Sequence, residues 1–205
     1  MKIRLVCFIF FNLWYMQCLA QFDSTLANTI QQLINADQAV RKRISAIEIT
    51  YGNKSPEAKK AYDSMVRVDK KHNPILKNII KTIGVYPGYS IVGEKESNNF
   101  WALVQHQDYD TAFQKQVLHF MAEAIKKNDV SLRDYAYLYD RLKVNTAQKQ
   151  LYGTQCILNP DETSYIPQPT EDSLNINLRR AQMGLGTIES YLGVMNERFS
   201  HTLRK

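Results

Sequence analysis

The sequence predicts a mainly α-helical protein, a multi-helix, bundle-like single domain with a C-terminal β-hairpin or pair of extended arms. Apolar residues recur every three or four positions through most of the chain between residues 24 and 145. Capping residues and glycines mark where these periodic segments begin and end. After Gln150 the pattern changes to short extended runs interrupted by prolines.

The start of the chain has the layout of a secretory signal peptide. Lys2 and Arg4 precede a short apolar run over residues 5–15, and Ala20 offers a small residue for cleavage. This run is shorter than the roughly 20 residues that cross a bilayer, so we expect no permanent membrane span. Cleavage would place the protein in a secreted or periplasmic location. Lipid attachment at Cys18 is the weaker alternative, because bulky residues precede it.

Removal of residues 1–20 would leave a single helical domain over residues 21–205, with Cys156 as its one thiol. Such a chain cannot form an internal disulfide, so its fold must depend on a buried core. The formal net charge would fall from +6 to +4 with the loss of Lys2 and Arg4. The basic excess over residues 41–81 is interpreted as a solvated helix face, and we expect no nucleic-acid partner.

The first predicted helix covers residues 24–50. Its apolar positions are spaced by threes and fours, and they are Leu26, Ile30, Leu33, Val40, Ile44 and Ile47. Asp37 stands where this series calls for an apolar residue, and Gly52 ends the helix.

The later elements are predicted from helix-capping residues and from prolines and glycines that end or interrupt helices. Ser55 and Pro56 open a second helix, Pro74 is expected to start or kink the stretch 75–83, and Gly84 ends it. The glycine-rich segment 85–94 predicts an ordered loop. Further helices are expected from about Ser97, after Asp110, after the Ser131 cap with Asp134, around 179–183 and over 187–199. The hairpin or extended arms are expected between residues 151 and 169.

Asp37 is the most informative single residue, because a carboxylate in an apolar seam must be paired or functional. Arg41 lies one helical turn later and can supply the pair. A polar residue of this kind can also set the packing register of helices, so both roles remain open.

The stretch WALVQHQDYDTAFQ places Gln105, His106, Asp108 and Asp110 within six positions. Asp110 precedes a helix and is expected to cap it. His106 and Asp108 would then lie at the joint between two helices. A His-x-Asp-x-Asp spacing does not aim three ligands at one point, so we expect no metal site.

Three polar residues occur farther along the chain. Asp140 and Arg141 are adjacent on a helix, so their side chains diverge by about 100°. Arg141 can clamp an anion or pair with a buried aspartate, and Gln155 can line a pocket or satisfy a neighbouring backbone group. Cys156 has apolar neighbours and is expected to be an inert thiol.

The chain lacks a Gly-rich phosphate loop, a serine nucleophile elbow and a paired-histidine zinc motif, so no cofactor is expected.

The blocks DQAVR, VDKKHNPIL, VYPGYSIVGE, WALVQHQDYDTAFQ, AYLYDRL, QLYGTQ and LRRAQMGL resemble, in this order, an uncharacterised bacterial family known only as a domain of unknown function. The resemblance covers most of the chain after residue 36 and brings no reaction or cofactor with it. It implies that the polar residues inside the blocks are the ones to study. His72 departs from the resemblance, since Asn is usual there.

Two functions follow from these observations. The first is a non-enzymatic exported module that binds a small ligand or a protein partner through Gln105, Arg141, Gln155, Asp140 and Arg41. The second is an acid-base hydrolase that uses His106 with Asp108 or Asp37 and holds an anionic substrate with Arg141. Close approach of His106, Asp37 and Arg141 in an open pocket would favour a site over a purely structural network.

Overall fold

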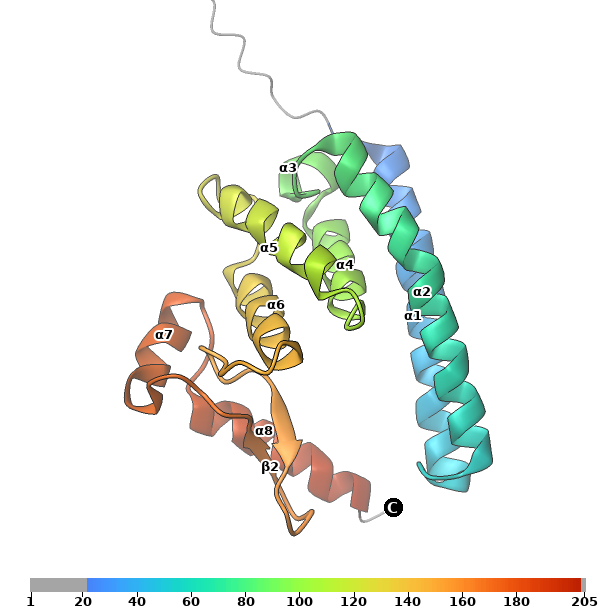
Figure 1. Ribbon diagram of the computed structural model, residues 1–205, viewed down its shortest axis with the longest axis vertical. Coiled ribbons are helices and arrows are strands. Elements are labelled where there is room, and N and C mark those ends of the chain that lie inside the picture. The colour runs from blue at the N-terminus through green and yellow to red at the C-terminus, as the bar shows by residue number, and fades with distance from the viewer. Residues whose placement is uncertain (1–21, 204–205) are drawn as a thin grey trace, which may run out of the picture.

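The computed structural model describes residues 22–203, and a long helical hairpin dominates it (Figure 1). Helix α1 (Ser24–Tyr51) and helix α2 (Pro56–Ile83) run antiparallel along one side. The expected signal peptide lies outside the described residues. Among residues 22–203, no helix is both long and apolar enough to cross a membrane.

The remaining elements pack beside one end of this hairpin and continue away from it. They are α3 (Tyr89–Val92), α4 (Glu94–Gln105), α5 (Thr111–Ile125), α6 (Leu132–Asn145), β1 (Cys156–Leu158), β2 (Tyr165–Pro167), the 3-10 turn η1 (Ser173–Asn175), α7 (Ile176–Gln182) and α8 (Ile188–Leu203). The two strands pair antiparallel as a hairpin. The mainly α fold and the C-terminal hairpin are therefore confirmed.

The predicted helix caps form, whereas Pro74 and the segment 85–94 differ from the prediction. Ser55 accepts a hydrogen bond from the Ala58 amide, and Ser131 accepts one from the Asp134 amide, both at 3.1 Å. Pro74 lies inside α2 and does not start a new helix. It is exposed, so the carbonyl that loses its partner one turn earlier can bond to water. The predicted loop 85–94 contains the short helix α3, and α4 begins at Glu94.

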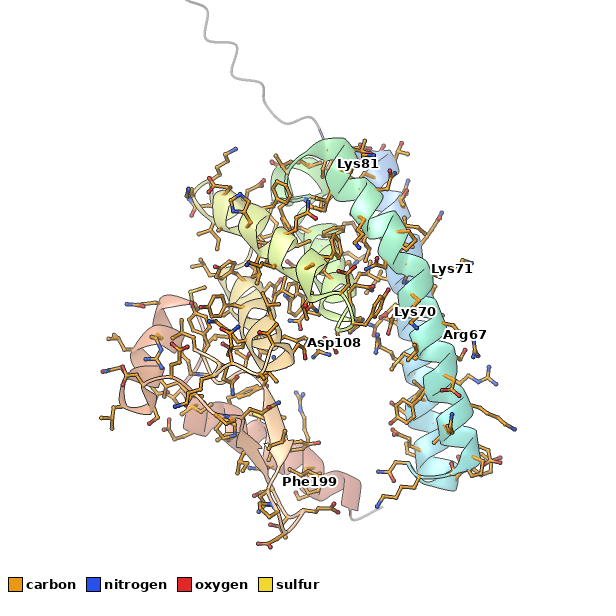
Figure 2. The ribbon with its side chains drawn as sticks, viewed as in Figure 1. Arg67, Lys70, Lys71, Lys81, Asp108 and Phe199 are labelled. Carbon is orange, nitrogen blue, oxygen red and sulfur yellow. The ribbon has the colours of Figure 1, made fainter. Side chains whose placement is uncertain are left out.

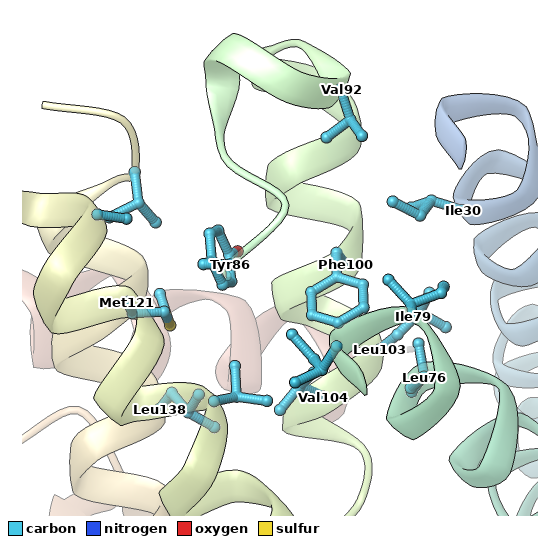
Figure 3. Close-up of a cluster of buried hydrophobic side chains, with 14 of the residues drawn as sticks. Ile30, Leu76, Ile79, Tyr86, Val92, Phe100, Leu103, Val104, Met121 and Leu138 are labelled. Carbon is cyan, nitrogen blue, oxygen red and sulfur yellow. The ribbon is translucent and has the colours of Figure 1, made fainter. Parts of the chain in front are cut away.

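The apolar core lies between the hairpin and helices α4, α5 and α6 (Figure 3). Phe100 of α4 stands at its centre with no exposed surface. The Tyr86 ring packs edge-on against it at 5.8 Å, and the Tyr86 hydroxyl donates to the Ser97 carbonyl. The buried members of this cluster all fall between Ala27 and Leu138, so the segment after α6 attaches by other means.

Candidate functional site

A pocket of about 310 Å³ lies where the end of α4 meets α6, the segment after α6, and α8. Its lining comes from four separate stretches of sequence, and the residues are Trp101, Ala102, Gln105, His106, Tyr137, Arg141, Thr154, Gln155 and Tyr191. Three of the predicted binding residues and one predicted catalytic residue are among them. The sequence blocks thus converge in space on one small hollow.

The turn between α4 and α5 places His106 at this pocket. Helix α4 ends at Gln105, and His106 is its C-cap residue. The Asp110 carboxylate accepts a hydrogen bond from the Phe113 amide at 3.1 Å, which confirms its predicted role as the cap of α5. Asn73 and Lys77 of α2 also contact Asp110, so the turn is held from both sides.

His106 is held from behind by Asp37. The His106 Nδ1 atom lies 2.9 Å from Asp37 Oδ1, although the residues are 69 positions apart. Asp37 is 1% exposed and occupies the seam of α1, as its place in the helical pattern predicts. Burial raises the pKa of Asp37, but His106 and Arg41 together outweigh burial and lower it. Asp37 therefore stays an anion that orients the imidazole.

Arg41 bridges two buried carboxylates. Its Nε lies 3.1 Å from Asp37 Oδ1 and its Nη2 lies 2.9 Å from Asp69 Oδ1, so the predicted Asp37 pair forms. Burial raises the pKa of Asp69 despite the charge of Arg41. Asp69 is therefore part of the network behind the pocket. It lies in the block VDKKHNPIL, and the sequence alone predicted no role for it.

Asp37, Asp69 and His106 each offer a ligand atom, and these atoms lie within 4.8 Å of one another. The Arg41 guanidinium already binds both carboxylates and supplies the positive charge that a cation would bring. The arrangement is a charge-paired network behind the pocket, with its one histidine reaching the pocket wall.

Asp108 pairs with Arg141 and not with His106. Two parallel contacts of 2.7 and 2.6 Å join Arg141 Nε and Nη2 to the carboxylate of Asp108, and Asn145 donates to it at 2.8 Å. Partial burial raises the pKa of Asp108, but Arg141 and Asn145 outweigh burial and lower it. Of the two aspartates proposed to orient His106, the geometry selects Asp37. Arg141 pairs with a half-exposed aspartate, not with a buried one.

Asp140 faces away from the pocket and fastens the following segment. It is fully buried and accepts backbone hydrogen bonds from Leu151, Tyr152 and Thr154 at 2.8 to 3.1 Å. Burial raises its pKa despite these donors. Among the predicted binding residues, Asp140 and Arg41 therefore support the site from behind.

Gly153 lets the chain turn between these contacts. Its φ of +67° lies in the left-handed region, and an added Cβ would meet Ile176 Cδ1 at 2.8 Å. This turn brings Thr154 and Gln155 to the pocket wall, and the Gln155 amide also donates to the Tyr137 carbonyl at 3.5 Å. Its neighbour Cys156 is half-buried, and burial raises the pKa of its thiol to about 11, in keeping with an inert role.

Aromatic side chains form a wall of the pocket that the candidate residues did not include. The rings of Trp101 and Tyr137 meet edge-on at 6.2 Å, and those of Tyr137 and Tyr191 meet at 6.3 Å. Trp101 lies four residues before Gln105, and Tyr137 lies four before Arg141. This spacing places each aromatic residue on the same helix face as a candidate residue, so the sequence could have identified both aromatic residues. Tyr191 comes from α8 and has no such relation to a candidate.

A larger hollow of about 690 Å³ lies between α1 and α2, away from the candidate residues. Long side chains such as Arg43, Lys60 and Arg67 border it. Figure 2 shows the basic residues Arg67, Lys70, Lys71 and Lys81 along α2. Arg67, Lys70 and Lys71 are exposed, which agrees with the solvated basic face expected from the sequence.

The model of one protein family, described as a family of unknown function (DUF6624), matches residues 24–204. The match spans the fold from α1 to α8 and includes every residue that lines the pocket. No curated protein and no solved structure matches the chain. Any function must therefore be inferred from the site itself.

Proposed function

The chain belongs to the DUF6624 family, whose function is unknown, and from this premise we propose that it is an exported protein that binds a small polar ligand. The ligand occupies the pocket at the end of α4. One observation carries the proposal. The Gln105 side chain lines the pocket, is 7% exposed, and makes no hydrogen bond to any other residue between 22 and 203.

The Gln105 amide has no protein partner, so both its donor and its acceptor are free to hydrogen-bond to a ligand in the pocket. Trp101, beside Gln105 on the wall, likewise has a buried indole N–H without an acceptor in the described structure. A bound polar molecule would give the Gln105 amide a partner and would lie beside the Trp101 side chain. The pocket volume is at the lower end of the range of roughly 300–1,000 Å³ for ligand sites, which favours a small molecule.

Tryptophan fluorescence tests this proposal directly. The chain has two tryptophans, and Trp14 lies within the residues whose removal we propose, so the exported protein keeps Trp101 as its single reporter at the pocket. Titration with a library of small polar compounds should change its emission for at least one compound. Gln105→Met preserves side-chain length and removes the amide, so it should weaken that compound by about tenfold, the equivalent of one to two hydrogen bonds.

Gln116→Met provides the matched control, because Gln116 is exposed on α5. It should leave the affinity unchanged. A compound that binds both variants as tightly as the parent chain would show that Gln105 does not contact the ligand.

Export rests on the basic and apolar layout of residues 1–20. Expression of the full chain in a bacterial host should yield protein outside the cytoplasm whose mass corresponds to a start at Gln21. A protein that keeps residues 1–20 and stays in the cytoplasm would contradict export without affecting ligand binding.

An acid-base hydrolase is the second candidate, and the contact between Asp37 and His106 favours it. A buried carboxylate that orients an imidazole is a common arrangement for a general base. Hydrolysis of a panel of small esters and amides should then be lost in His106→Asn. The control His119→Asn, at an exposed histidine of α5, should keep full activity. Equal activity of both variants would exclude His106 as the base.

A further inference from the structure

We infer that the ligand of this pocket is a small carboxylate that carries an apolar or aromatic group. The inference rests on the proposed function and narrows it to a chemical class. It starts from the charged residues of the lining. Arg141 is the lining residue with a fixed charge, and no aspartate or glutamate is among the lining residues.

The carboxylates behind the pocket are already occupied by donors. Asp37 accepts from Arg41 and Gln38 and contacts His106. Asp108 accepts from Arg141 and Asn145, and Asp140 accepts from three backbone amides and the Thr154 hydroxyl. These anions therefore have little capacity left to attract a cationic ligand.

The donors of the lining, in contrast, lack acceptors. The buried Trp101 Nε1 has no partner, and the Gln105 amide has none within residues 22–203. The contacts of Arg141 to Asp108 use Nε and Nη2, which leaves Nη1 for another acceptor. His106 uses Nδ1 toward Asp37, so the Nε2 of its neutral imidazole is an acceptor and does not add to these donors. A ligand rich in acceptor oxygens complements this excess of donors.

A second cation lies behind the aromatic wall. Arg180 is 2% exposed, and its guanidinium donates to the carbonyls of Tyr152 and Gly186 at 2.7 and 2.6 Å. It also lies 5.1 Å from the centre of the Tyr191 ring. No carboxylate forms an ion pair with it in the part of the chain that the structure describes. Its charge adds to the attraction of an anion near Tyr191.

A carboxylate fits the lining better than a phosphate does. The Nε and Nη2 atoms of Arg141 already bind Asp108, so only Nη1 of that guanidinium remains for the ligand. Three aromatic side chains, Trp101, Tyr137 and Tyr191, offer surface to an apolar group. The volume of about 310 Å³ has room for a molecule of the size of phenylacetate.

Isothermal titration of the full chain with matched acid and amide pairs tests this inference. The probes are acetate, hexanoate and phenylacetate, the corresponding three amides, and inorganic phosphate. Phenylacetate or hexanoate should bind at least tenfold more tightly than its amide and more tightly than acetate or phosphate. Trp101→Phe keeps the ring and removes the N–H, so it should weaken the acid severalfold and leave the amide little changed.

Arg141→Gln should reduce the preference for acid over amide to less than threefold, while Arg67→Gln, on the exposed face of α2, should preserve it. Unfolding curves confirm that each variant is folded.

Amides that bind as well as acids would overturn the carboxylate inference and leave the proposed ligand pocket in place. Phosphate binding as tight as that of the acids would overturn it too, as would acid binding insensitive to Trp101→Phe and Arg141→Gln. A chain that binds none of these probes, while another neutral compound changes Trp101 fluorescence, would overturn this inference alone. A lack of response to every compound in both experiments would overturn the proposed function as well.

Discussion

Residues 24–145 and the segment that follows them hold their shape through different interactions. The first part buries aliphatic and aromatic side chains from α1, α2, α4, α5 and α6 against one another. The second part contributes no member to that cluster. Asp140 of α6 binds its backbone, and the rings of Tyr137 and Tyr139 pack against those of Tyr191 and Tyr152. Within the second part, the buried side chains of Gln150 and Arg180 bind the backbone between residues 152 and 186.

The difference between the two parts explains where the pocket lies. Apolar packing tends to close gaps, because each unfilled volume costs free energy. Hydrogen bonds fix directions instead, and Asp140 and Gly153 position Thr154 and Gln155 without filling the space before them. The pocket forms at the boundary, with Trp101 and His106 from the packed part and Thr154 and Tyr191 from the hydrogen-bonded part.

Phe100→Ala should have the largest effect on stability and should act on the packed part. Removal of a fully buried phenylalanine ring costs about 4 kcal/mol of the free energy of unfolding. Urea denaturation followed by circular dichroism measures it. Phe22→Ala, at a side chain that is 56% exposed, should cost less than about 1 kcal/mol. Similar losses for both variants would contradict the assignment of the core.

Asp140→Asn should cost about 3 kcal/mol and act on the hydrogen-bonded part. The asparagine NH₂ group cannot accept from the backbone amides of residues 151–154, so at least one buried N–H loses its acceptor. Limited proteolysis should then cut the chain after α6 while α1 to α6 stay intact. Asp161→Asn, at an exposed position of the β1–β2 turn, serves as the control. Loss of both parts together would show that they unfold as one unit.

Asp134 should make the packed part sensitive to pH, by about 2–3 kcal/mol. Burial raises the pKa of its carboxyl to about 6 from an ordinary value of 3.8. The folded state therefore binds the proton more tightly than the unfolded state does. The stabilisation by that proton is fully present below about pH 4 and is lost as the pH rises through about 6.

Asp134→Asn removes this titration, so the variant should be more stable than the parent chain at pH 8 and similar to it at pH 4. Thermal unfolding across this pH range provides the measurement. The same pH dependence in the variant would assign the effect to another group.

Asp110→Ala should have the smallest of these effects, about 1 kcal/mol, through loss of the α5 cap. Asp110→Asn keeps an acceptor for the Phe113 amide and should lose only part of this amount. Chemical denaturation distinguishes the two variants. An equal loss in both would assign the effect to the Lys77 ion pair instead of the cap.

The local parts of this structure were predictable from the sequence. Ser55, Asp110 and Ser131 mark helix starts because a side-chain oxygen can satisfy backbone amides only a few residues away. The pair of Asp37 with Arg41 follows from helical spacing. Helix α3 was missed because one turn between two glycines has no period to detect.

The pairings within the site were not predictable in the same way. His106 meets Asp37 across 69 positions, and Arg141 meets Asp108 across 33. Composition and spacing set no angle between the helices that carry these residues. The sequence also leaves open which of the adjacent Asp140 and Arg141 points to the pocket, because a helix can turn either side toward its neighbours.

The length of the α1–α2 hairpin has a consequence for motion. Each helix has 28 residues and is therefore about 42 Å long, yet the hydrogen bonds that join the hairpin to the end of α4 and the turn after it lie at Asp37 and Asp69. Beyond these residues the two helices continue side by side past the end of α4 (Figure 1). Amide hydrogens near Gly52 should consequently exchange with solvent by fraying of this end, while those beside Ile30 and Leu76 exchange only when the whole core opens.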